Sequence, residues 1–165
     1  MKKWLFLACI VILAVCQMTF LDAFRFFGVK PDLLLIFCII SGLIFNFDLK
    51  WLLAGAALSG IFKDVFNVYA PGLNSVLFIL IALLTAHISK KITLDSIPIQ
   101  AGFTFCVCLL YNAVLRGIMA YMGNFISVGM FLRITILGSL YTALFFPVLF
   151  NLVQALEIEK ADYES

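Results

Sequence analysis

Long apolar runs separated by short polar stretches constrain the fold of this chain more than any other feature. The sequence has 165 residues, of which 65% are hydrophobic and 12% are charged. Soluble domains have about 45–50% apolar and about 25% charged residues, so this chain cannot cover a folded surface with polar groups. Because about 20 apolar residues make one membrane-spanning helix, we predict an all-α integral membrane protein without a folded domain outside the bilayer.

The apolar runs predict one transmembrane domain over residues 1–165, a polytopic bundle of six transmembrane helices. The approximate spans are 4–24, 32–47, 51–68, 73–89, 97–122 and 133–156. The second span is short for a hydrocarbon core of about 30 Å, which predicts protein neighbours or local thinning of the bilayer. A five-span arrangement, in which the third and fourth spans are partly re-entrant, remains an alternative.

The basic residues predict the orientation, because cytoplasmic loops are enriched in lysine and arginine. Six basic residues fall near span ends on the side of both termini, and three fall on the opposite side. We therefore expect both termini in the cytoplasm. The net charge of +2 is small, which argues against nucleic acid as a partner.

Local patterns predict a helix start, a close helix contact and a turn. Pro31 and Asp32 suit the first positions of a helix, since proline lacks an N–H that would be unpaired there and aspartate favours the positive end of the helix dipole. Residues 55–60 contain two patterns of small residues spaced by four on one face, which favours close packing of membrane helices. Pro71-Gly72 predicts a tight turn with a positive φ at the glycine.

Charged residues inside two spans are candidate functional residues. Lys63 and Asp64 lie in the third span and Arg116 in the fifth, and a charge at a helix centre costs about 2.5–3.5 kcal/mol on insertion scales. Both positions lie near the outer end of their spans. We therefore predict that Asp64 pairs with Arg116, while Lys63, about 100° around the helix, extends outward to the interface.

Two interpretations of these charges remain open. In the first, the charges only neutralise each other and fix the helix register. In the second, Asp64, Asn67 and Asn74 line an outward-facing polar recess around the predicted turn, where a partner or ligand docks.

The chain offers no predicted catalytic or metal site. Its five cysteines all lie in apolar runs, where they act as small apolar residues. The sequence has no Gly-rich phosphate loop, no H-E-x-x-H motif and no nucleophile elbow. Asp64 has no second carboxylate at its depth, as an aspartyl protease would need. We expect no enzymatic activity, cofactor or metal.

Three segments together resemble the family of the rod shape-determining protein MreD. Val29-Lys30-Pro31-Asp32-Leu33-Leu34-Leu35 opens the second span, Gly60-Ile61-Phe62-Lys63-Asp64-Val65-Phe66 lies near the end of the third, and Pro71-Gly72-Leu73-Asn74 opens the fourth. In that family a Pro-Asp-Leu start is followed by a Gly-x-x-x-Asp segment and a Leu-Gly turn. Here a proline stands before the glycine of the turn. The matching positions are Asp32, Gly60, Asp64 and Gly72, whereas Arg116 comes from the charge argument alone.

The resemblance implies a non-enzymatic subunit of the bacterial cell-wall elongation machinery in the cytoplasmic (inner) membrane. It implies MreC as the partner that the chain scaffolds, with MreB, RodA and a transpeptidase of peptidoglycan synthesis as further partners. It also implies a fold similar to the substrate-binding components of energy-coupling-factor transporters. The predicted polar site, which binds a partner or supports the structure, contains Asp32, Gly60, Lys63, Asp64, Asn67, Gly72, Asn74 and Arg116.

Two alternative functions stay open. One is a small-solute-binding component of a membrane transporter, with the solute in the recess beside Asp64. The other is an enzyme that acts on lipid-linked precursors.

Overall fold

The computed structural model describes residues 3–19, 28–44, 49–65, 71–89, 96–123 and 127–161. The helices in these ranges are α1 (Lys3–Thr19), α2 (Leu33–Ile44), α3 (Leu49–Val65), α4 (Leu73–Ser89), α5 (Ile97–Tyr121) and α6 (Val128–Ala161). The structure is all-helical over this part of the chain, which confirms the predicted all-α class.

Each described helix overlaps one of the predicted spans, and the largest differences in bounds are in the sixth, which covers Val128–Ala161 rather than 133–156. The predicted ends of the first three spans, at residues 24, 47 and 68, lie outside the described residues. Pro31 was predicted at the first helical position, yet α2 begins at Leu33, because Asp32 provides the helix cap. The sixth helix begins at Val128 rather than at 133, since the Ser127 carbonyl and hydroxyl already accept bonds from the first free amides of α6.

Within the described ranges, two helices are long and apolar enough to cross a membrane, over Pro98–Tyr121 in α5 and Val128–Gln154 in α6. Three shorter apolar helical segments cover Phe6–Thr19, Leu33–Leu43 and Leu73–Ser89. The structure is therefore compatible with a membrane location by helix length and composition. The six-span arrangement stays a prediction.

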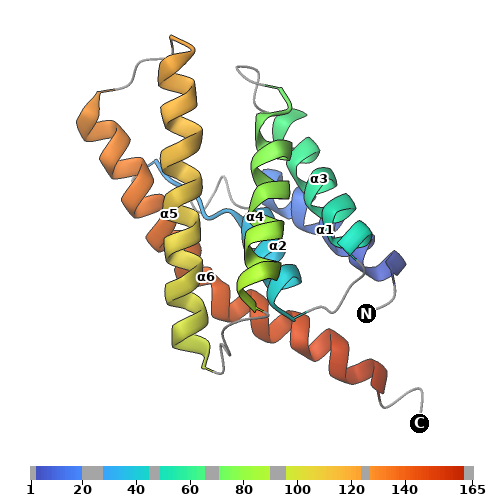
Figure 1. Cartoon of the computed structure of the whole chain (residues 1–165). Helices are drawn as coiled ribbons and strands as arrows, with labels where there is room; N and C mark the ends of the chain where they lie inside the picture. Colours follow the sequence, from blue (N-terminus) through green and yellow to red (C-terminus); the bar gives the residue numbers. More distant parts are fainter. Residues whose placement is uncertain are drawn as a thin grey trace.

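The helices form two antiparallel pairs with α2 between them. α3 packs along α4 and α5 packs along α6, while α2 contacts both pairs and α1 lies against α2 and α3 (Figure 1). α4 and α5, which stand side by side in Figure 1, have much less contact with each other than the helices within each pair. Contact between the two pairs therefore depends largely on α2.

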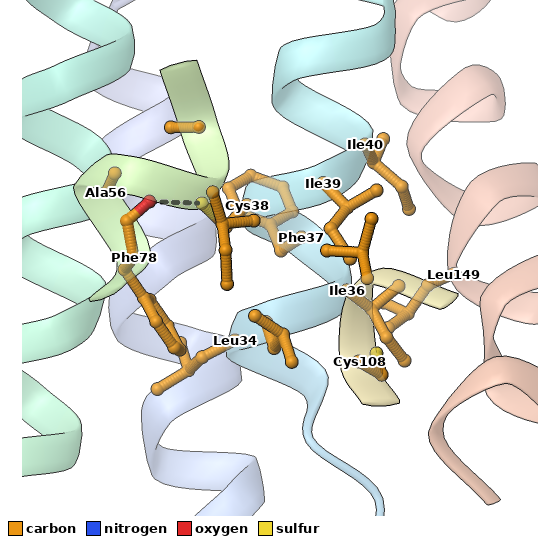
Figure 2. Packing of buried hydrophobic residues seen from close by; sticks show 14 of the residues in the cluster. Leu34, Ile36, Phe37, Cys38, Ile39, Ile40, Ala56, Phe78, Cys108 and Leu149 are labelled. Atoms are coloured by element: carbon orange, nitrogen blue, oxygen red, sulfur yellow. Dashed lines mark hydrogen bonds between the residues drawn. The ribbon is translucent and has the colours of Figure 1, made fainter. Parts of the chain in front are cut away.

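The central helix α2 is buried on every side. Every residue from Leu34 to Ile40 is at most 3% exposed, as expected for a helix that is apolar all round and surrounded by protein. Figure 2 shows α2 side chains packed against Ala56 of α3, Phe78 of α4, Cys108 of α5 and Leu149 of α6. Of the two alternatives predicted for this short segment, protein neighbours or a thinner bilayer, the structure shows protein neighbours.

The small residues of α3 contact two different helices. A Cβ added to Gly60 would overlap the backbone of Ser75 in α4, whereas one added to Gly55 would overlap the Phe6 ring of α1. The prediction of one small-residue face is therefore wrong. The two patterns are offset by one residue, about 100° around the helix, and each side allows one neighbour to approach closely.

We predict that Gly60→Ala destabilises the protein by about 1–3 kcal/mol, because the new methyl group meets backbone that cannot rotate away. Gly117→Ala in α5 is the matched control, since its Cβ would have no neighbour within 4 Å. This control should be neutral or stabilising, as glycine is unfavourable in a helix interior. Denaturant titration of the purified protein measures both changes, and equal effects of the two variants would contradict the close contact.

Candidate functional site

The segment from Gly28 to Asp32 leads into α2 and lines a polar site inside the bundle. In Figure 1 it is the blue trace that reaches the start of α2 from behind α5. Asp32 caps the helix: its Oδ1 accepts the Leu35 N–H at 3.2 Å, and its carbonyl accepts the Ile36 N–H at 3.1 Å. A side-chain acceptor at this position satisfies an amide that the helix itself cannot pair.

Two other helices complete this buried helix start. Gln17 of α1 accepts the Leu34 N–H at 3.0 Å through Oε1 and donates from Nε2 to Asp32 Oδ1 at 3.2 Å. Thr142 of α6 accepts the Asp32 N–H at 3.2 Å. The first turn of α2 is therefore held from both sides by polar side chains.

Lys63 of α3 forms an ion pair with Asp32 Oδ2. Its ammonium group also lies 4.6 Å from the centre of the Tyr111 ring and 5.3 Å from that of Phe78. The side chains of Lys63 and Asp32 are 21% and 13% exposed. The prediction that Lys63 extends outward is therefore wrong, because a carboxylate and two aromatic faces attract the cation inward.

Asp64 caps a different helix, α4. Its two carboxylate oxygens accept the backbone N–H groups of Asn74 and Ser75, both at 3.0 Å, the Asn74 amide at 2.9 Å and the Ser75 hydroxyl at 2.7 Å. Gly72 precedes α4 with φ of +87° and has no side chain with which to cap it. The carboxylate of Asp64 supplies that acceptor from the neighbouring helix, and its negative charge suits the helix N-terminus.

The predicted pair of Asp64 and Arg116 is wrong. The carboxylate of Asp64 is occupied by its four bonds to Asn74 and Ser75 at the start of α4. Arg116 instead lines a cavity, and its Nε atom is buried with no hydrogen-bond partner within the described ranges.

Tyr111 of α5 joins the two capping aspartates into one network. Its hydroxyl donates to Asn74 Oδ1 at 2.5 Å, while its ring faces the ammonium group of Lys63 and contacts Phe78 edge-on. The network therefore takes polar groups from five helices and from the residue that caps α2. In chain order these are Gln17, Asp32, Lys63 with Asp64, Asn74 with Ser75, Tyr111, and Thr142.

A cavity of about 220 Å³ adjoins the ion pair. Its walls include Asp32, Lys63, Tyr111, Asn112 and Arg116. A polar recess therefore exists, but Asp64 and Asn74 do not line it as predicted, because they face each other at the start of α4. Asn67 lies outside the described residues.

The two predicted glycines of the site act in helix packing and in a turn. Gly60 allows the close contact with α4, and Gly72 has the predicted positive φ in an exposed turn. Across the described ranges, no three histidine, cysteine, aspartate or glutamate side chains gather closely enough to hold a metal ion.

Four members of the network, Gln17, Ser75, Tyr111 and Thr142, were not predicted from the sequence. Gln17 was detectable, since an amide inside an apolar run near the outer end is a signal of the same kind as a charge. Thr142 was not, because a threonine in a helix usually bonds its own backbone, as this one also does to Gly138. Tyr111 has no local sequence pattern that distinguishes it from other aromatic residues.

We predict strong coupling between Asp32 and Lys63. Lys63→Met should cost about 3–5 kcal/mol, because it leaves a buried carboxylate unpaired, and adding Asp32→Asn should recover part of that loss. The combination of Asp64→Asn with Arg116→Gln is the control and should be additive within about 0.5 kcal/mol. Unfolding free energies of the single and double variants measure both couplings, and an additive first pair would contradict the ion pair.

A second prediction concerns the cap of α4. Asp64→Ala should lower the unfolding free energy by about 2 kcal/mol, the upper range for a helix cap. Amide hydrogen exchange should accelerate at Asn74 and Ser75 but not in the first turn of α5, which Asp64 does not touch. Unchanged exchange at both amides would show that another group caps this helix.

The chain was also compared with known proteins. No family model, no curated protein and no solved structure matches it. The interpretation of the site therefore depends on its own residues and contacts.

Proposed function

We propose that this chain is a non-enzymatic, multi-pass membrane subunit of the bacterial cell-wall elongation machinery that acts as MreD does. In this proposal six helices span the cytoplasmic membrane with both termini in the cytoplasm. The protein scaffolds MreC and, with it, MreB, RodA and a transpeptidase.

The observation that supports the proposal most is the convergence of the residues that carry the resemblance. Asp32 caps α2, and Asp64 caps α4. Gly60 lets α3 and α4 approach, and Gly72 makes the turn between them. These four positions are spread over 41 residues of sequence, yet they determine how the same three helices start and pack.

The described helices also suit a scaffold. Many large apolar side chains are exposed on them, among them Leu144 at 65% and Val148 at 63%, which fits helices surrounded by lipid or by partner helices. Because the polar groups of the network bond mainly to one another, the bundle can present a rigid surface to a partner.

A solute-binding component of a transporter is the second candidate, favoured by the cavity of about 220 Å³ beside Asp32 and Lys63. The two functions differ in what accompanies the purified chain. A transporter component should retain a solute and co-purify with ATPase subunits, whereas a scaffold should co-purify with MreC.

We predict that loss of this chain from a rod-shaped host makes the cells round, and that the wild-type chain restores the rods. Asp64→Ala should fail to restore them, because the start of α4 and its contacts with α3 become less stable. Microscopy of cell width, together with affinity purification of the tagged chain, measures shape and partners in one strain.

Gly117→Ala, whose added methyl group meets no neighbour, is the matched variant that should restore rod shape. Immunoblots of the membrane fraction establish that each variant is present in equal amount. Normal cell shape without the chain, combined with capture of an ATPase pair in place of MreC, would favour the transporter.

A further inference from the structure

Charged side chains line the cavity beside the ion pair. Its charged lining residues are Lys30, Lys63 and Arg116, which are cationic, and Asp32, which is anionic. Lys63 already has Asp32 as its partner. The Nε atom of Arg116 is buried without a partner among the described residues, and a buried cationic donor without an acceptor is costly. The cavity therefore favours an anionic group at Arg116.

A second hollow, of about 150 Å³, lies between α4 and α5. Apart from Tyr111, its lining is wholly aliphatic and consists of Leu77, Leu80, Ile81, Leu84, Val107, Leu110 and Val114. It follows the boundary where α4 and α5 have little direct contact. An occupant of this groove must be apolar, since no polar partner is present along its described walls.

Tyr111 of α5 lines both the cavity and the groove, so the two hollows lie next to each other along this helix. Along α5 the groove begins at Val107 and the cavity extends to Arg116, a rise of about 14 Å at 1.5 Å per residue. The cationic end is therefore nearer the C-terminus of α5, and the apolar end extends toward the middle of the helix. One molecule that fills both spaces has an anionic head and an aliphatic tail.

We propose that this composite site binds one anionic phospholipid, with its phosphate at Arg116 and an acyl chain in the groove between α4 and α5. The proposal depends on the membrane location given above, but not on a role in cell-wall synthesis. Charge complementarity favours a lipid over an apolar partner helix, because the helix would leave Arg116 without an acceptor. A free phosphate would satisfy Arg116 but would leave the groove empty.

The test uses the full chain purified into nanodiscs that contain equal amounts of phosphatidylglycerol and phosphatidylcholine. Native mass spectrometry of the released protein should show phosphatidylglycerol retained in preference to phosphatidylcholine. Arg116→Gln should reduce that preference about tenfold or more, as expected for the loss of a charge-assisted hydrogen bond. Lys50→Gln, which removes an exposed cation at the other end of α3, should leave the preference unchanged.

A bulky residue in the groove tests the acyl-chain half of the site. Leu80→Trp should lower retention of phosphatidylglycerol severalfold, whereas Leu144→Trp, at an exposed position of α6 outside the groove, should not. Where Arg116→Gln does not fold, Arg116→Lys replaces it and should weaken the preference only in part, because lysine keeps the charge but loses the planar fork of donors.

Three results would overturn the proposal. The first is equal retention of the two lipids by the wild-type chain. The second is displacement of bound lipid by inorganic phosphate with no effect of Leu80→Trp, which would identify a free oxyanion as the occupant. The third is normal lipid retention in Leu80→Trp together with a change in self-association, which would identify the groove as a contact between copies of the chain. None of these results depends on cell shape, so the scaffold function is tested separately.

Discussion

The structure depends on the capping of two helix N-termini, those of α2 and α4, that lie inside the bundle. The first amides of any helix lack partners within that helix, and each one that is buried without an acceptor costs about 1–3 kcal/mol. At α2 and α4 the acceptors are carboxylates, Asp32 from the chain just before α2 and Asp64 from the neighbouring helix α3. The short α2 can therefore begin deep in the bundle, where its apolar surface contacts both helix pairs.

The negative charges of the two buried carboxylates need to be compensated. Asp64 and Asp32 are compensated by different kinds of group. Asp64 is satisfied by four donors at the start of α4, so amides and a hydroxyl take the place of a counter-ion. Asp32 accepts fewer such bonds and is paired with Lys63 instead. Since Lys63 and Asp64 are adjacent in α3 and about 100° apart, this one helix fixes the starts of two others.

The sequence was sufficient to predict the helices and several of the polar residues of the site. It was not sufficient to predict which partners these polar residues have. Apolar runs identify helices because every backbone group in a membrane must be paired within its segment. A charge in such a run indicates a partner without naming it. Asp64 and Arg116 have opposite charges and similar predicted depth, yet Asp64 bonds to the backbone amides of α4. An argument from side-chain charges does not take backbone donors into account.

The same limit explains why the recess was predicted in the wrong place. Asp64 and Asn74 are the conspicuous polar residues near the predicted turn, but they are buried and bond to each other, and Tyr111 bonds to Asn74. The cavity instead adjoins Asp32 and Lys63, where the chain before α2 enters the bundle.

Arg116 has a buried donor without a partner among the described residues, and it stands apart from this network. Because Asp32, Lys63 and Asp64 are paired within the chain, an anion that reached Arg116 would add an interaction without breaking any of those that hold the helices together. Occupancy of the cavity and stability of the bundle are then largely independent properties. Under the proposed scaffold function, the outer surface would stay the same for partners whether or not the cavity is filled, whereas a transporter component needs its bound and free states to differ.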